Sequence, residues 1–257
     1  MRWILFCLVT LVFISCEFKS RELTAKDIEL WKHTPAWKLA KAVKVEDTLK
    51  IKKILSEGNI KIDHPEPKYG ITLLYWAVWN NKLEMTEFLL SQGANPNFHI
   101  FFNGRSPVTV AAFQSDIEIL STLLHYGGNP NDHILPTDSV TYERTSATPL
   151  SQAACWSLPK VKLLVESGAD LYLGMKPGFN PLVQAAIMKN FKVVRYFLID
   201  CGMDYSQSYT VIANGDTLRI KEILSGYYNQ TEENMKLRQE IFDYIDQQEQ
   251  KKAAQNP

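Results

Sequence analysis

The stretch Thr148-Pro149-Leu150-Ser151-Gln152-Ala153 decides the fold of this chain, because three related stretches repeat its pattern. They begin at Thr72, Ser106 and Asn180, so that successive copies are offset by 34, 42 and 32 residues. A Leu-rich segment and then a glycine turn follow each copy, the turns lying at Gly93, Gly127, Gly168 and Gly202. Two short amphipathic segments closed by a glycine turn form a helix-turn-helix unit that cannot bury its apolar face alone. The sequence therefore predicts a stack of such units.

This pattern resembles the ankyrin repeat, whose signature reads T-P-L-H-x-A-A, then a pair of leucines, then G-A-D. Thr148 is placed to cap the inner helix, Pro149 lies where a missing N–H costs nothing, and Gly168 supplies a left-handed turn. The family's histidine is replaced in every copy, by Tyr75, Thr109, Ser151 and Val183. The resemblance implies an all-α fold, an ankyrin-type helix-turn-helix repeat solenoid with short hairpin loops and a C-terminal helix.

The four clear copies are flanked by weaker ones. Residues 34–59 predict a degenerate first repeat, and residues 209–224 predict a closing repeat, so the repeat domain covers 34–225 with about six repeats. Residues 226–257 form a C-terminal helical tail with an apolar stripe made of Met235, Ile241, Phe242 and Ile245. This stripe predicts a helix docked on the last repeat, and a free partner-binding helix is the alternative.

The N-terminus predicts export. Met1-Arg2 leads into an apolar run from Trp3 to Ile14, which as a helix rises about 18 Å and falls short of the roughly 30 Å membrane core. Residues 1–15 therefore form a signal peptide rather than a membrane anchor. Phe13-Ile14-Ser15-Cys16 resembles the lipobox of bacterial lipoproteins, although leucine is usual where Phe13 stands. The resemblance implies cleavage before Cys16, acylation of that cysteine with palmitate-like chains, and a polar tether over 16–33.

The predicted location is therefore the bacterial cell envelope, with the domain lipid-anchored to a membrane and facing the periplasm. An ordinary secretory signal with an incidental cysteine, or a short buried helix, remains the alternative. Two cysteines stay in the exported domain, Cys155 and Cys201. The repeat register places them on different helices of neighbouring repeats, so we expect no disulfide between them.

Composition and motifs exclude several functions. The chain has 28 Lys+Arg against 28 Asp+Glu, so it lacks the basic excess of a nucleic-acid-binding protein. It contains no nucleophile elbow, zinc-protease motif, P-loop or dinucleotide fingerprint. Its five histidines, His99 and His133 among them, are scattered without ligand spacing. The sequence predicts no catalytic residue, no metal site and no cofactor.

The resemblance also implies a partner-binding set. In ankyrin proteins the hairpin residues before T-P, and two residues after the inner-helix alanines, face a concave groove. The matching positions are Tyr69, Ile71, Trp79, Phe102, Arg105, Phe113, Arg144, Trp156, Phe179, Ile187 and Met188. This set is aromatic and apolar with two arginines, a composition typical of protein-binding hot spots. Burial of these side chains under other parts of the chain is the alternative.

Between Asn131 and Ala147 lie roughly nine extra residues, which predict a longer hairpin on the same face or a merely tolerated loop. Three function classes fit these features. The first is an envelope-anchored protein-binding module, such as an immunity protein that occludes a secreted toxin or effector. The second is a structural or assembly factor for envelope machinery. The third, an enzyme or redox-protective factor, would need a titratable cluster that the sequence does not show.

The first prediction concerns Cys16. Labelled palmitate should enter the protein, and the label should vanish in Cys16→Ser, because three acyl chains bury enough methylenes for stable anchoring whereas one does not. The measurement is labelling followed by membrane fractionation. Unchanged label, or a variant that stays membrane-bound through an uncleaved Trp3–Ile14 helix, contradicts the lipoprotein prediction.

Overall fold

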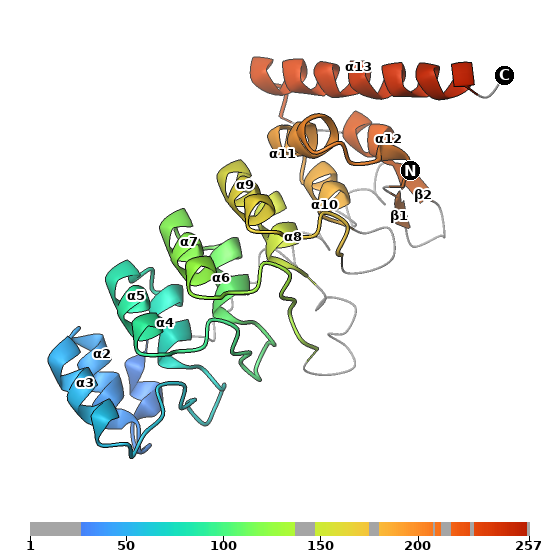
Figure 1. The fold of residues 1–257 in the computed structure, drawn as a ribbon. Helices are drawn as coiled ribbons and strands as arrows, with labels where there is room; N and C mark the ends of the chain where they lie inside the picture. The colour runs from blue at the N-terminus through green and yellow to red at the C-terminus, as the bar shows by residue number, and fades with distance from the viewer. Residues whose placement is uncertain are drawn as a thin grey trace.

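A computed structural model describes residues 27–136, 147–174, 180–207, 209–211, 217–226 and 229–255. The fold is all-α, as predicted, with antiparallel helix pairs stacked side by side into an elongated array and a long helix across its C-terminal end (Figure 1). The inner helices are α2 (Trp37–Lys44), α4 (Leu73–Trp79), α6 (Pro107–Phe113), α8 (Pro149–Ala154) and α10 (Pro181–Ile187). The outer helices are α3 (Thr48–Ser56), α5 (Leu83–Ser91), α7 (Ile117–His125), α9 (Leu158–Glu166) and α11 (Phe191–Arg195).

Each of the four clear copies starts its inner helix with a side-chain cap. Thr72 and Asn180 accept hydrogen bonds from backbone N–H groups three residues on, at 3.2 and 3.1 Å. Ser106 and Thr148 form reciprocal capping boxes, in which a hydroxyl three residues on accepts from the cap's own N–H. Pro149 occupies the first turn of α8 as predicted. The T-P stretch therefore marks the start of each inner helix.

Small residues let the inner helices pack closely. Ala77 and the alanine pairs at 111–112, 153–154 and 185–186 are all buried in one continuous core. The helices contact each other in the order α4, α6, α8, α10, and α10 contacts α12 (Ile220–Ser225). Successive repeats thus share one core instead of having separate ones.

Polar side chains at the inner-to-outer turns tie neighbouring repeats together. The Ser115 hydroxyl donates to the carbonyl of Val78 at 3.0 Å, and the buried Lys160 ammonium donates to the carbonyl of Ala111 at 2.9 Å. Both acceptors lie near the C-terminal end of the inner helix of the preceding repeat. Burial lowers the pKa of Lys160 from its ordinary value. These bonds fix the spacing between repeats.

The array begins earlier than residue 34. A 3₁₀ turn, η1 (Ile28–Trp31), packs against α2, with Ile28 and Trp31 both buried. The predicted tether of 16–33 therefore extends too far toward the C-terminus, because the indole of Trp31 belongs to the core. Residues 1–26, which hold the predicted signal peptide and Cys16, lie outside the described residues.

The closing repeat differs from prediction. Residues 209–213 were expected in a helical unit, yet β1 (Tyr209–Val211) pairs antiparallel with β2 (Thr217–Arg219), with Thr210 opposite Leu218. β-Branched residues supply part of both strands, which suits an extended backbone. Between β2 and the C-terminal tail the described residues hold one helix, α12, so the last unit contributes a single helix to the stack.

The last outer helix, α11, carries one residue more before its glycine turn than the other outer helices do. Ten residues separate the start of α7 from Gly127, and eleven separate the start of α11 from Gly202. A π-helical segment, η2 (Tyr196–Asp200), continues α11 and absorbs the extra residue. Met203, in the turn that follows, is buried and its N–H donates to the carbonyl of Phe197 at 2.9 Å.

The C-terminal tail forms α13 (Glu232–Gln255), which docks on the fourth repeat. Ile241 and Ile245 are buried, and Arg195 pairs with Glu240 at 2.8 Å. Met235 is exposed, so the predicted stripe begins later than Met235. Across the described residues, no helix is both long enough and apolar enough to cross a membrane.

The loops before the inner helices are joined to each other through the backbone. The N–H of Phe102 donates to the carbonyl of Tyr69 at 3.1 Å, and that of Leu135 donates to the carbonyl of Gly104 at 2.9 Å. Gly104 has a φ of 66°, and a Cβ placed there would overlap the Leu135 carbonyl oxygen. Glycine is therefore required by both conformation and close approach.

The second prediction follows from this approach. Gly104→Ala should lower the free energy of unfolding by about 3 kcal/mol, whereas Gly93→Ala should cost only about 1 kcal/mol. Gly93 is the matched control, because its φ of 88° is also positive but its Cβ would meet nothing within 4 Å. Urea unfolding measures both. Equal losses would show that the contact between Gly104 and Leu135 does not hold the loops together.

Candidate protein-binding face

The candidate site is the face formed by the loop tips and the C-terminal ends of the inner helices. Counted from the helix caps, Trp79, Phe113 and Ile187 occupy equivalent positions on α4, α6 and α10. Each of these three is half-buried. The inner helices pack in sequence order, so these side chains form a row along the array. We call this row, together with the tips of the loops that precede the inner helices, the hairpin face.

Two aromatic residues from adjacent loops form the first contact on the hairpin face. The rings of Tyr69 and Phe102 meet edge to face, with centroids 5.2 Å apart and an interplanar angle of 83°. Phe102 is 39% exposed, and Tyr69 is half-buried beneath the Lys68 ammonium, 4.7 Å above the ring. Edge-to-face pairs are favourable beyond the area they bury. The two loop tips are therefore held in a fixed relation.

A second aromatic contact joins Trp79 to Tyr75, the residue that replaces the family's histidine. Their rings are stacked 6.1 Å apart at 11°, and Tyr75 is buried. Burial raises the pKa of Tyr75 to about 12, against an opposing effect of the Arg105 charge and the Asn103 side chain. Trp79 thus rests on a buried, neutral phenol and is itself half-buried.

Arg105 lies over the ring of Phe113, with its guanidinium carbon 5.0 Å from the ring centroid. Both side chains are half-buried. A cation over an aromatic face gains electrostatic stabilisation and restricts the arginine's rotamers. This pair connects the second loop to α6 and keeps a positive charge at the surface.

The structure corrects one residue of the predicted binding set. Ile71 is fully buried, because the loop turns inward before Thr72 and its N–H donates to the buried Glu66 carboxylate at 3.2 Å. It is a core residue and cannot contact a partner. Arg144 and Phe179 lie outside the described residues and stay predictions.

The third repeat presents its aromatic residue differently. Cys155 takes the position equivalent to Trp79 and is buried, whereas Trp156 is 53% exposed. Helix α8 ends one residue earlier than α6, so the turn after α8 projects Trp156 into solvent. Met188, the equivalent residue in the fourth repeat, is half-buried. Cys155 is buried and Cys201 half-buried, and neither forms a disulfide in the described part of the chain.

Sequence reasoning missed other exposed apolar residues at the loop tips. Phe101 is 56% exposed, and Leu135, Tyr172 and Leu173 are also exposed. Phe101 neighbours Phe102 in the sequence, so a doubled phenylalanine in a loop was the available signal. The loop tips of the hairpin face are therefore more apolar than the positions matched to the ankyrin pattern had indicated.

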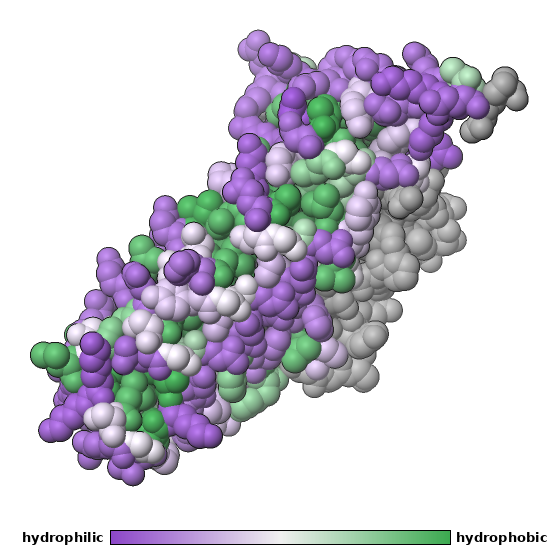
Figure 2. All heavy atoms as spheres, viewed as in Figure 1, coloured by the Kyte–Doolittle hydropathy of each residue, from purple (hydrophilic) through white to green (hydrophobic). Residues whose placement is uncertain are grey.

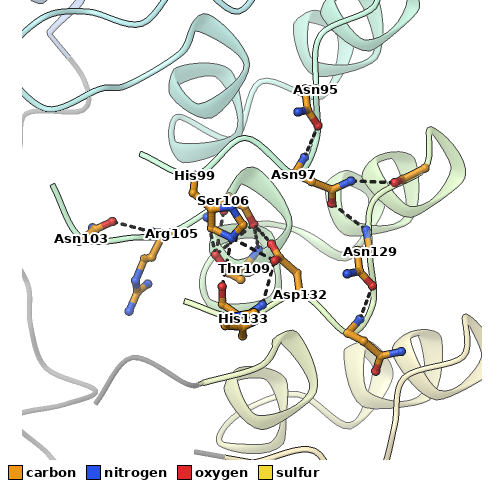
Figure 3. A network of polar contacts seen from close by, with 12 residues as sticks. Asn95, Asn97, His99, Asn103, Arg105, Ser106, Thr109, Asn129, Asp132 and His133 are labelled. Atoms are coloured by element: carbon orange, nitrogen blue, oxygen red, sulfur yellow. Dashed lines mark hydrogen bonds and ion pairs between the residues drawn. The ribbon is translucent and has the colours of Figure 1, made fainter. Parts of the chain in front are cut away.

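A ladder of asparagines fixes the other side of these loops (Figure 3). The Asn97 side chain accepts from the N–H of Asn129 at 2.8 Å and donates to the carbonyl of Gly127 at 3.0 Å. Asn131 repeats both bonds one unit later, with Asp170 and Gly168, at 2.7 and 3.0 Å. Each asparagine thus links its loop to the end of the next outer helix. The asparagine-rich turns serve packing between repeats.

Between the asparagine ladder and Arg105, Figure 3 shows a buried carboxylate that joins the second and third repeats. Asp132 accepts hydrogen bonds from the hydroxyl of Ser106 and from Nε2 of His99, the latter at 3.0 Å. The same nitrogen lies 3.1 Å from the carbonyl oxygen of His133. No local sequence pattern predicts the contact of His99 with the 132–133 loop, because it joins residues more than thirty positions apart.

This group of serine, histidine and aspartate is not a nucleophilic arrangement. The carboxylate of Asp132 stands between the other two side chains, whereas a catalytic histidine would bond the serine oxygen directly. Ser106 is also fully buried and caps α6. Within the described ranges, no three His, Cys, Asp or Glu residues gather as a metal site.

A surface hollow on the outer helices offers no catalytic groups either. It has a volume of about 370 Å³ between α7 and α9, on the outer helices, and only Lys162 and Glu166 in its lining are charged. Figure 2 shows apolar side chains gathered over these outer helices, with hydrophilic ones around them. The hairpin face remains the candidate site.

The third prediction concerns pH. The hydrogen bond to Asp132 raises the pKa of His99, so His99 adds stability below its ordinary value near 6.5 and loses this contribution as pH rises through the raised value. The pKa of Asp132 is lowered, because its hydrogen bonds with His99 and Ser106 outweigh burial. Its contribution is present above about 3.8 and is lost as pH falls through the lowered value. The His99→Gln loss should therefore peak between about pH 4 and 6.5.

Urea unfolding at pH 5, 7 and 9 tests this window. His99→Gln should cost on the order of 1 kcal/mol at pH 5 and clearly less at pH 9. His125→Gln is the control, because His125 is exposed on the outer helix α7. A His99→Gln loss that is the same at all three pH values contradicts a charged contact with Asp132.

Comparison with known proteins agrees with this geometry. The family model for ankyrin repeats (3 copies) matches residues 39–134. A segment of 61 residues is 39% identical to transient receptor potential cation channel subfamily A member 1 of Homo sapiens, and it makes up 24% of this chain and 5% of that protein. Only ankyrin repeats are found, and no catalytic domain is identified. Residues 39–134 are therefore similar to ankyrin repeats, and the helix pairs that follow them continue the same stack.

Proposed function

We propose that this chain binds another protein through its hairpin face. The observation that carries this proposal is the set of three ring contacts, Tyr69 with Phe102, Trp79 with Tyr75, and Arg105 with Phe113. Each contact holds a partly exposed side chain in place before any partner arrives. Ordering side chains in advance lowers the entropy cost of association, and tyrosine, tryptophan and arginine are enriched at hot spots.

The more specific proposal is a lipid-anchored, periplasm-facing immunity protein that occludes a secreted toxin or effector. It is supported by the lipobox-like Phe13-Ile14-Ser15-Cys16 and by the lack of catalytic motifs in the sequence. Occlusion needs only a rigid surface and a stoichiometric partner. The extra residues between Asn131 and Ala147 would add reach on the hairpin face, since Ile134 N–H and the Ala147 carbonyl hold their ends together at 3.1 Å.

A structural or assembly factor for envelope machinery is the second candidate. The docked helix α13 favours neither candidate, because its apolar residues Ile241 and Ile245 are already buried against the array. The two candidates differ in their partner, which is a delivered effector in the first and a constitutive envelope component in the second.

The fourth prediction locates the binding face in cells. A photo-crosslinking phenylalanine derivative placed at Phe102 should give a discrete adduct with a partner, whereas the same group at Tyr126 should give none. Tyr126 is a matched control, because it is 37% exposed on an outer helix and Phe102 is 39% exposed on the hairpin face. Phe113→Ala should weaken the complex by about 2 kcal/mol, roughly thirtyfold in dissociation constant. Equal adducts from both positions would refute a dedicated hairpin face.

The fifth prediction separates the two candidate functions. Deleting the gene should make cells sensitive to attack by sibling cells if the protein confers immunity, and a competition assay measures this. A chain lacking 137–146 should still bind the effector but protect less. The deletion is confined to this stretch because Asp132 and Ile134 are buried parts of the fold. A deletion strain that competes normally but shows envelope-assembly defects would support the assembly role instead.

A further inference from the structure

The turn between α2 and α3 exposes two apolar side chains to an unusual degree. Leu49 is 80% exposed and Val45 is 69% exposed, the two highest values among the large hydrophobic residues of the described chain. They lie four positions apart, around the end of the first inner helix and the start of its outer helix. In the equivalent positions, the next repeat along the chain carries the polar residues Asn80 and Glu84. Two aliphatic side chains thus protrude where the next repeat has polar ones.

Lysines surround these two residues. The α2–α3 segment, 37–56, contains six lysines and two acidic residues, although the whole chain is neutral. Lys44, Lys50 and Lys53 are exposed, and within the described residues no acidic group lies within ion-pair distance of them. In Figure 2 the end of the array that holds α2 and α3 shows apolar side chains at the edge of the molecule beside hydrophilic ones.

The two acidic residues of this segment are already engaged. The Glu46 carboxylate pairs with the Lys82 ammonium of the second repeat at 3.1 Å. The Asp47 carboxylate caps α3 by accepting from the backbone N–H of Lys50 at 3.0 Å. Neither neutralises the lysine ammonium groups of the turn. The surface therefore combines unpaired positive charge with protruding aliphatic groups.

We propose that this turn docks on an anionic phospholipid surface, with Val45 and Leu49 inserted among the headgroups and the lysines contacting lipid phosphates. Aliphatic tips bordered by cations match the layered chemistry of such a membrane, apolar below and negative at its surface. The shape also fits, because a protruding turn can enter a fluid interface, whereas a protein partner would need a cavity to receive it.

The place of the turn in the fold leaves the loop tips of the hairpin face free. Helix α3 runs from this turn toward the loop that holds Tyr69, so the membrane would contact the end of the first helix pair that lies away from the loop tips. The turn also belongs to the repeat nearest Cys16 in the sequence. The docking does not depend on acylation of Cys16, but an anchor there would raise the local concentration of the turn at the membrane.

Hydrogen–deuterium exchange on the full chain tests the proposal, read by mass spectrometry with two kinds of vesicle. Phosphatidylglycerol-containing vesicles should slow amide exchange in peptides covering 44–53 at least fivefold relative to pure phosphatidylcholine vesicles. Peptides from α5 and α7 should exchange equally with both. Because the measurement is local and compares lipids, it succeeds or fails independently of palmitate labelling at Cys16.

Two variants and a control complete the test. Val45→Ser/Leu49→Ser and Lys44→Gln/Lys50→Gln/Lys53→Gln should each abolish the protection, the latter through a loss of about fivefold in membrane affinity per lysine. All five residues are exposed, so circular dichroism should show unchanged folding. Met235→Ser, which removes an exposed apolar residue from α13, should keep the protection. Equal exchange with both vesicle types, or protection that survives in both variants, would overturn the proposal.

Discussion

The close approach of the inner helices is the contact on which the rest of the structure depends. Alanines at 77, 111–112, 153–154 and 185–186 leave room for the next helix, so each repeat buries its apolar face against its neighbours. A single helix pair has no core of its own, and the array is stable only as a stack. The positions of the loops, and therefore of the hairpin face, follow from the spacing that these alanines set.

Polar contacts between repeats make that spacing rigid. The asparagine ladder and the Lys160 ammonium bond the backbone near the ends of helices in the neighbouring repeat. Asp132 gathers Ser106 and His99 into one buried contact. Such contacts satisfy buried polar groups and fix one arrangement of the loops. A rigid face of this kind suits recognition of a protein surface, since its side chains lose little further conformational entropy on binding.

The loop tips and the α2–α3 turn differ in chemistry. Loop residues such as Phe102 and Arg105 form an aromatic surface with one charge, whereas the α2–α3 turn combines aliphatic tips with lysines. The first composition is typical of protein interfaces and the second of anionic lipid surfaces. Under the two proposals made above, the protein would hold its partner close to a membrane.

The T-P stretches and glycine turns determined the repeat architecture from the sequence alone, because caps and left-handed turns are local properties of the backbone. The sequence also indicated Trp79, Phe102, Arg105 and Phe113 as surface candidates, from their position relative to those stretches. Only the tertiary structure decided that Ile71 is buried, since one residue's difference in where a loop turns inward moves a side chain from surface to core. Likewise, only the tertiary structure places His99 against Asp132, because that contact depends on how far one repeat lies from the next.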